Sequence, residues 1–247
     1  MKKLIFTMAL VFQLVLGAAN TEETFASGNK LYTEQNYSEA LVQYHSLADS
    51  GYVSSALFFN MGNAYYRLNQ LGNAILYYEK AKAIDPDNKD ILANLAIADA
   101  GKIDKFETVP TPALTRIWNS VIGLFSASTW LTIALVFIFG GASFLTLFLV
   151  NKNKSTVKFS AYVALGALGL FFLFIGKMKQ DQMQNNIYGV LVTSNAYVKS
   201  EPNGGQDLFI VHEGSKAKIE ETFQDWIKVR FSDGKSGWLT SSEFTAI

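Results

Sequence analysis

The sequence of 247 residues has no cysteine and only two histidines, His45 and His212. Without cysteine the chain cannot hold a disulfide, a thiolate zinc site, an iron–sulfur cluster or a cysteine nucleophile. Two histidines leave little for imidazole chemistry. Net charge is also lacking, because 21 Lys and Arg residues balance 21 Asp and Glu residues. A neutral chain argues against nucleic acid as the main partner, since phosphate binding needs a basic face.

Charged residues are absent from two long stretches, 117–150 and 159–176. A helix needs about 20 apolar residues to cross a bilayer, with a range of about 17–25. Soluble proteins rarely have two such runs in succession, so we predict transmembrane helices at 129–150 and 159–176. Neither contains an acidic or basic residue, which favours an anchor over an ion pathway. Three small residues share one face of the second helix, where close packing is expected, namely Ser160, Ala164 and Ala167.

Residues 1–19 have the pattern of a signal peptide for export. Lys2 and Lys3 precede an apolar run, and small residues follow it at 17–19. An uncleaved membrane anchor is the alternative interpretation. No cysteine follows the run, so a bacterial lipoprotein is excluded.

The short connection between the two apolar stretches, residues 151–158, is basic. It contains no acid and three lysines, which are Lys152, Lys154 and Lys158. Because cytoplasmic loops carry an excess of Lys and Arg, we predict a cytoplasmic loop. Lys177 and Lys179 weaken the charge argument, but the export signal agrees with it. We therefore expect a two-pass protein of the bacterial inner membrane, with both soluble domains in the periplasm.

The region 103–128 is predicted to be a linker with an amphipathic helix at the membrane interface. Its apolar residues recur at helical spacing and are Leu114, Ile117, Trp118, Val121, Ile122 and Phe125. An extended start of the first span explains the same pattern equally well. After the second span, residues 177–186 have no apolar periodicity and are predicted to form a polar stalk.

The amino-terminal part of the chain repeats itself. Gly28-Asn29 recurs as Gly62-Asn63, a shift of 34 positions, and Tyr44 recurs as Tyr78 with the same shift. This pattern resembles the tetratricopeptide (TPR) repeat, a pair of antiparallel helices. The second copy, 55–88, contains Pro86, which cannot continue a helix and so marks its end. We expect a TPR domain at 20–102, with two repeats and a capping helix.

The TPR resemblance implies that peptides or protein segments bind along the concave face of the array. The matching positions of this sequence are Phe25, Asn29, Tyr32, Phe59, Asn60, Asn63, Tyr66, Arg67 and Asn94. Some members hold a terminal carboxylate with asparagines and basic residues. Phe25 and Asp90 stand where those members have lysine, so the match to such a clamp is incomplete. Packing within the array is the alternative role of Phe25, Tyr32 and Tyr66.

Residues 187–247 form short apolar runs separated by turn residues, which is typical of strands. We expect about five or six strands in a small all-β barrel. Alternation places Ile227, Val229 and Phe231 in its core, and His212 is expected on the surface. The domain resembles the bacterial SH3 type through AYVKSEP at 196–202, HEG at 212–214, DWIKV at 225–229, DG at 233–234 and GWL at 237–239.

The SH3-type resemblance implies binding of peptides or cell-wall glycopeptide. The candidate aromatic surface consists of Tyr197, Trp226 and Trp238. Covering one end of a barrel too small to bury them is the alternative role of the two tryptophans.

Motifs for catalysis and for cofactors are missing from the sequence. No glycine-rich phosphate loop has the required strand-to-helix context. Asp85 and Asp87 flank Pro86 and are better interpreted as turn residues than as paired catalytic carboxylates. We therefore expect no catalytic residue, no metal site and no cofactor, and the chain is predicted not to be an enzyme.

The predicted fold is a multi-domain membrane protein with an all-α TPR array, a two-helix transmembrane hairpin and a small all-β SH3-type barrel. This order of parts resembles the BatE-like members of the Bat (Bacteroides aerotolerance) family. The resemblance implies a non-catalytic scaffold for protein partners, working with von Willebrand factor A-type Bat proteins and a MoxR-type ATPase in stress tolerance. The alternative is an envelope module that binds peptidoglycan through the SH3-type domain.

Overall fold

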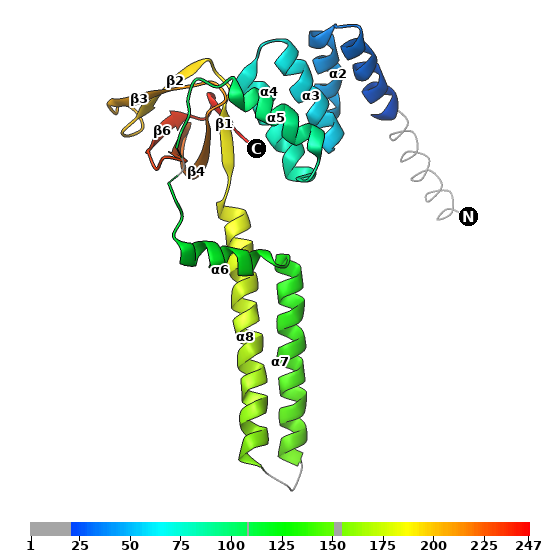
Figure 1. The fold of residues 1–247 in the computed structure, drawn as a ribbon, viewed down its shortest axis with the longest axis vertical. Helices are drawn as coiled ribbons and strands as arrows, with labels where there is room; N and C mark the ends of the chain where they lie inside the picture. The colour runs from blue at the N-terminus through cyan, green and yellow to red at the C-terminus, as the bar shows by residue number, and fades with distance from the viewer. Residues whose placement is uncertain (1–20, 108, 151–154) are drawn as a thin grey trace, which may run out of the picture. The chain divides into compact units, whose positions relative to one another are not determined.

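The computed structural model describes residues 21–107, 109–150 and 155–247. The chain forms two compact units. The first, here called the repeat–sheet unit, joins the amino-terminal helices to the segment Tyr188–Ile247, and the second, the hairpin unit, is Val109–Ile187. Figure 1 shows the elements of both units. The predicted signal peptide lies outside the described residues, as does the first half of the predicted loop, 151–154.

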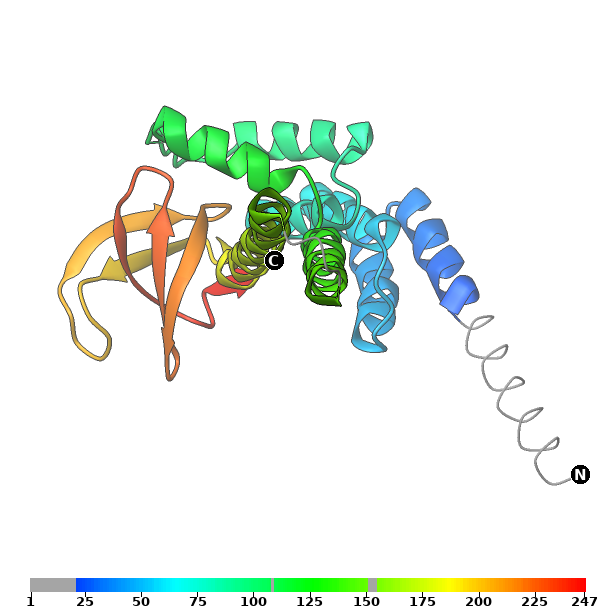
Figure 2. The same cartoon turned by 90° about the horizontal axis from the view of Figure 1, so that it is seen from below.

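The repeat–sheet unit begins with a row of antiparallel helices, as Figures 1 and 2 show. The row contains the helical residues 21–33 and the helices α2 (Tyr37–Asp49), α3 (Ser55–Arg67), α4 (Leu71–Ile84) and α5 (Lys89–Ala100). Ser54 caps the start of α3, because its side chain accepts a hydrogen bond from the Leu57 amide at 3.1 Å. The predicted TPR-like array is confirmed.

A glycine–tyrosine contact packs each pair of helices tightly. A Cβ atom on Gly28 would lie 2.5 Å from the ring of Tyr44, and one on Gly62 would lie 2.6 Å from the ring of Tyr78. Both tyrosines are buried. The same contact therefore recurs one sequence period later, which explains why the glycine and the tyrosine repeat together.

The carboxy-terminal part of this unit is an antiparallel sheet. Its strands are β1 (Tyr188–Leu191), β2 (Asn195–Lys199), β3 (Asp207–His212), β4 (Lys216–Phe223), β5 (Trp226–Phe231), β6 (Ser236–Thr240) and β7 (Phe244–Ala246). Their order is β3-β2-β6-β5-β4-β1-β7. Seven strands replace the smaller number predicted, because β7 has only three residues and is recognised by its pairing with β1 rather than by an apolar run. Ile227, Val229 and Phe231 are buried, as predicted.

The sheet packs directly against the repeat helices. Val190 of β1 shares a hydrophobic cluster with Ile75 of α4 and Leu95 of α5. Glu213 accepts a hydrogen bond at 3.1 Å from the Gly72 amide in the first turn of α4. Lys216 forms an ion pair with Glu79 at 2.8 Å. The sequence predicts two separate soluble domains, whereas the structure joins them into one unit.

The segment after α5 completes this junction. The Asp104 carboxylate accepts hydrogen bonds from the His212 amide at 2.6 Å, from the Ser215 hydroxyl at 2.7 Å and from His212 Nδ1 at 3.0 Å. Phe106 packs on Phe231, with the ring centroids 4.7 Å apart. His212 is half-buried, and its contact with Asp104 was not predicted, because the two residues are remote in sequence.

The stability of the junction should depend on pH through Asp104. Burial alone would raise the pKa of this carboxyl, but the hydrogen bonds from Ser215 and His212 outweigh burial and lower it. A lowered folded pKa gives stability that is present above the ordinary pKa of 3.8 and is lost as the pH falls through the folded value. We expect Asp104→Asn to cost about 1.5–3 kcal/mol at neutral pH.

Unfolding of the detergent-solubilised chain at several pH values measures this contribution. The difference between wild type and Asp104→Asn should shrink below pH 3.8. A difference that stays constant down to pH 2 would contradict a role for the charge.

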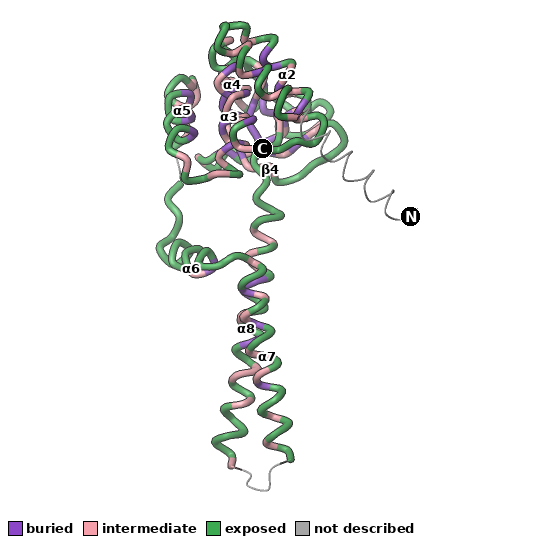
Figure 3. The backbone as a smooth tube through the Cα atoms, turned by 90° about the vertical axis from the view of Figure 1, so that its right-hand side faces the viewer, coloured by how far each residue is buried: buried purple, intermediate pink, exposed green. Residues whose placement is uncertain are grey.

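The hairpin unit consists of α6 (Ala113–Gly123), α7 (Ala127–Val150) and α8 (Thr156–Asn185). α7 and α8 are long and apolar enough to cross a membrane, judged by length and composition. Figure 3 shows that both are mostly exposed along their length. α8 runs through most of the predicted stalk, whose lysine and glutamine residues favour helix.

α8 packs against α7 through a face that differs from the one predicted from the sequence. Ser160, Ala164 and Ala167 are exposed, whereas Gly169 is buried. A Cβ atom on Gly169 would lie 2.6 Å from Cγ1 of Ile138. The glycine permits the closest approach and therefore decides which face makes the contact.

Candidate peptide-binding groove

Two asparagines organise a repeated hydrogen-bond network between the helices. Asn29 Oδ1 accepts bonds from the Tyr44 hydroxyl at 2.9 Å and from Asn60 Nδ2 at 2.8 Å. One period later, Asn63 Oδ1 accepts bonds from the Tyr78 hydroxyl at 2.8 Å and from Asn94 Nδ2 at 2.8 Å. We call the first set the first rung and the second set the second rung.

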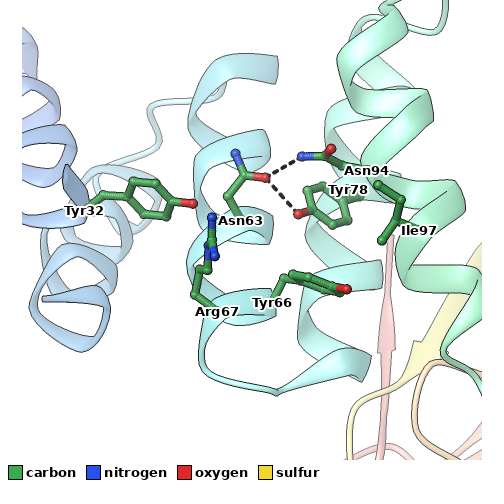
Figure 4. Close-up of a pocket in the computed structure, with 7 residues that line it drawn as sticks. All are labelled: Tyr32, Asn63, Tyr66, Arg67, Tyr78, Asn94 and Ile97. Carbon is green, nitrogen blue, oxygen red and sulfur yellow. Dashed lines mark hydrogen bonds between the residues drawn. The ribbon is translucent and has the colours of Figure 1, made fainter. Parts of the chain in front are cut away.

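The rungs fix how the asparagine side chains are oriented. An asparagine amide has one acceptor oxygen and one nitrogen with two donor hydrogens. In the second rung the oxygen of Asn63 receives both bonds, as Figure 4 shows. Its Nδ2 atom is therefore the atom left to donate to a ligand.

A cavity of about 280 Å³ opens beside the second rung. Its lining is drawn in Figure 4 and consists of Tyr32, Asn63, Tyr66, Arg67, Tyr78, Asn94 and Ile97. These residues come from the first helical segment and from α3, α4 and α5. In Figure 4 the Arg67 guanidinium points toward the Tyr32 hydroxyl. The structure thus brings together five of the positions matched from the sequence, namely Tyr32, Asn63, Tyr66, Arg67 and Asn94.

The cavity offers positive charge and hydrogen-bond donors. Hydrogen bonding to Tyr32 raises the pKa of the Arg67 guanidinium, so this group stays charged. Burial raises the pKa of the Tyr78 hydroxyl, which therefore stays neutral and donates to Asn63. Among the residues that the structure describes, no carboxylate forms an ion pair with Arg67. The arrangement suits an anionic or carbonyl-bearing group.

Other predicted groove residues lie outside the cavity and hold the array together. Asn29 and Asn60 form the first rung. Phe59 packs on Tyr78, with ring centroids 5.9 Å apart, and Phe25 packs on Tyr44 at 6.1 Å. These contacts give both phenylalanines a packing role.

Two lining residues, Tyr78 and Ile97, are absent from the sequence-based set of groove residues. The sequence held a signal for Tyr78, because it follows Asn63 by the same 15 positions that separate Tyr44 from Asn29. Ile97 lies 34 positions after Asn63, so the same period marks its place, but an apolar residue stands there where the two repeats have asparagine.

The three aromatic residues predicted on the SH3-type surface differ in exposure. Tyr197 of β2 is 55 % exposed, whereas Trp226 and Trp238 are half-buried. The indole nitrogen of Trp226 donates to Asn203 Oδ1 at 3.0 Å. Lys228 Nζ lies 6.0 Å from the centroid of the Trp238 ring. Ligand binding at this surface stays a prediction.

Both histidines have structural contacts. His45 Nε2 lies 2.7 Å from the Tyr65 hydroxyl, and His212 contacts Asp104 at the junction. Within the described ranges, no group of three His, Cys, Asp or Glu residues could hold a metal ion.

Comparison with known families agrees with the helical repeat. The family model of the tetratricopeptide repeat matches residues 55–88, which is the second copy predicted from the period. No curated protein matches the chain. The match supports a role in protein interaction, and the two apolar helices suggest association with a membrane.

Proposed function

We propose that this chain is a membrane-anchored adaptor whose TPR groove captures a segment of a protein partner. The convergence of Asn63, Arg67 and Asn94 on one cavity carries the proposal. TPR repeats are typically non-catalytic interaction modules, and we assign the chain no catalytic step.

The captured group is a carboxylate, either an acidic side chain or a chain terminus. Arg67 provides a permanent positive charge, and Asn63 Nδ2 provides a donor that the second rung holds in place. Hydrogen bonds between charged partners are stronger than neutral ones, and guanidinium matches carboxylate geometry. Tyr66 and Ile97 add apolar surface beside the charge, which suits the side chains that flank a carboxylate in a peptide.

The anchor crosses the membrane twice and leaves both ends on the periplasmic face of a bacterial inner membrane. The repeat–sheet unit contains residues that precede the hairpin and residues that follow it, so both must lie on the same side of the membrane. This arrangement supports an even number of crossings. The basic connection at 151–158 and the export pattern support the direction.

Two more specific roles follow from the sequence resemblances. In the first, the partners are von Willebrand factor A-type Bat membrane proteins in a stress-tolerance complex that includes a MoxR-type ATPase. In the second, the SH3-type surface binds peptidoglycan, and the exposure of Tyr197 favours this role. Peptidoglycan that retains none of the full-length protein in a pull-down excludes the second role.

Photocrosslinking in membranes tests the groove. Benzoylphenylalanine in place of Tyr66, which is exposed and lines the cavity, should capture the partner segment. Adding Arg67→Ala should reduce the captured amount by about 10-fold or more, which corresponds to loss of one charge-assisted contact. Lys89→Ala is the matched control, because Lys89 is an exposed cation outside the cavity.

The crosslinked product also shows which chemical group of the partner lies in the groove. Mass spectrometry of the crosslinked peptide should place an acidic residue or a chain terminus beside the attachment point. Equal capture with and without Arg67 would contradict the proposed groove, and so would capture of segments without a carboxylate.

A further inference from the structure

The helix α6, between the repeat–sheet unit and the first apolar helix, has one apolar and one polar face. Apolar residues recur every three or four positions as Leu114, Ile117 and Val121, and Leu124, which caps the helix, continues the pattern. Its polar residues are Thr115, Arg116, Asn119 and Ser120. The helix ends at Gly123, and α7 begins separately at Ala127. α6 is therefore not an extended start of α7.

Apolar contacts fix α6 against the end of the hairpin. Ile122 is buried in a cluster with Trp130 of α7 and Ile175 of α8, and Trp118 packs at its edge. The indole nitrogen of Trp130 donates to the Ile122 carbonyl at 3.1 Å. Figure 1 shows α6 lying across α8 at this end. The helix is thus held in one orientation within the hairpin unit.

The polar face of α6 has a different contact on α8. Gln182 donates to Asn119 Oδ1 at 3.3 Å. Gln182 lies seven positions beyond Ile175, which is about 10 Å along a helix. Between them α8 changes from apolar to polar, with Lys177 and Lys179. The apolar face of α6 therefore lies toward the apolar part of the hairpin, and the polar face lies toward its polar end.

Much of the apolar face is left uncovered. Leu114 is 79 % exposed, Ile117 is 62 % exposed and Leu124 is 66 % exposed. This surface continues the apolar surface of α7 and α8 at the level where that surface ends. Bilayers have a boundary of this kind between acyl chains and headgroups, and amphipathic helices lie in it with the apolar face inward.

We propose that α6 lies in the membrane interface, with Leu114, Ile117 and Leu124 in the acyl-chain boundary and Arg116 at the headgroups. The inference depends on the membrane anchoring of α7 and α8. It adds a lipid contact that fixes the hairpin against rotation and vertical movement.

Nitroxide accessibility in lipid vesicles tests the proposal, and the cysteine-free chain allows single labels. The full-length protein is reconstituted into vesicles of phosphatidylethanolamine and phosphatidylglycerol. Labels replace Leu114 and Ile117 on the apolar face, and Ser120 serves as the matched control on the polar face. Molecular oxygen concentrates in the bilayer, whereas a nickel chelate stays in water. We expect a several-fold higher ratio of oxygen to nickel collisions at 114 and 117 than at 120.

A label replacing Leu147 separates the failure of this inference from failure of the membrane anchor. Leu147 lies on α7 and is 65 % exposed, so a spanning α7 gives high oxygen access there. Lipid-like access at 147 with nickel access at 114 and 117 overturns the interfacial position of α6 alone. Shielding of 114 and 117 from both reagents means that protein covers them, and this also overturns it. Nickel access at 147 overturns the anchor itself.

Discussion

Deleting α8 alone is expected to abolish formation of the repeat–sheet unit. With one crossing instead of two, the sheet would be made on the opposite side of the membrane from the repeat helices. The hydrophobic cluster of Ile75, Leu95 and Val190 could not form. The carboxylate of Asp104 would also lose both of its partner residues, His212 and Ser215. The effect should be complete, because no rearrangement within one chain restores contacts across a bilayer.

A disulfide across the junction measures this result in membranes. The Ser215 hydroxyl donates a hydrogen bond to the Asp104 carboxylate at 2.7 Å, so the two side chains are neighbours, and cysteines at both positions serve as the crosslinking pair. A protease site in the connection 151–154 then cuts the otherwise intact chain. The two fragments stay joined only where the disulfide has formed.

The matched control restores the number of spans with a different sequence. Replacing α8 by an unrelated apolar helix of equal length should recover the disulfide, because an even number of crossings is what the junction requires. Disulfide formation in the chain that lacks α8 would contradict the two-pass arrangement. Failure of the replacement would show that α8 contributes through its own residues.

Local periodicity explains which parts of the structure were predictable. The second repeat and its cavity residues Asn63 and Arg67 follow from a pattern within about 34 residues, and the family match covers the same positions. A repeat places each residue relative to its neighbours, so one recognised copy predicts the helices, their crossings and the groove. The alternation in β5 is equally local, and its buried residues were predicted correctly.

The junction could not be predicted, because its contacts join residues more than 100 positions apart. His212 precedes a turn and Asp104 follows a helix, and neither position carries a motif. The contact of Glu213 was equally unpredictable, since only the docked sheet brings this residue to the first turn of α4. The prediction of which face of α8 packs against α7 was wrong for a related reason. Small residues occur on more than one side, and only the partner helix decides that Gly169 is the residue in contact.

Gly72→Ala is expected to separate the sheet from the repeat helices although it should favour α4 by itself. A Cβ atom at this position would lie 2.6 Å from the Leu191 carbonyl oxygen and 3.1 Å from the Val192 Cα atom. Both are backbone atoms, at the end of β1 and in the residue after it, so no side-chain rotation relieves the clash. Alanine ordinarily stabilises a helix relative to glycine by about 1 kcal/mol. Overpacking costs about 1–3 kcal/mol. A lower stability of Gly72→Ala therefore identifies the clash with the docked sheet as the cause, because the change within α4 alone would raise the stability.

Paired spin labels report the separation directly, because the chain has no other cysteine. One label replaces Glu39 on α2 and the other replaces Glu221 on β4, and both side chains are exposed. Wild type should give one narrow distance distribution, and Gly72→Ala should broaden it. Gly123→Ala is the control, since a Cβ atom at Gly123 meets nothing within 4 Å. A narrow distribution with raised stability in Gly72→Ala would mean that the sheet does not dock on α4 in the membrane-bound protein. The Glu213 contact with the Gly72 amide would then have no part in holding the two regions together.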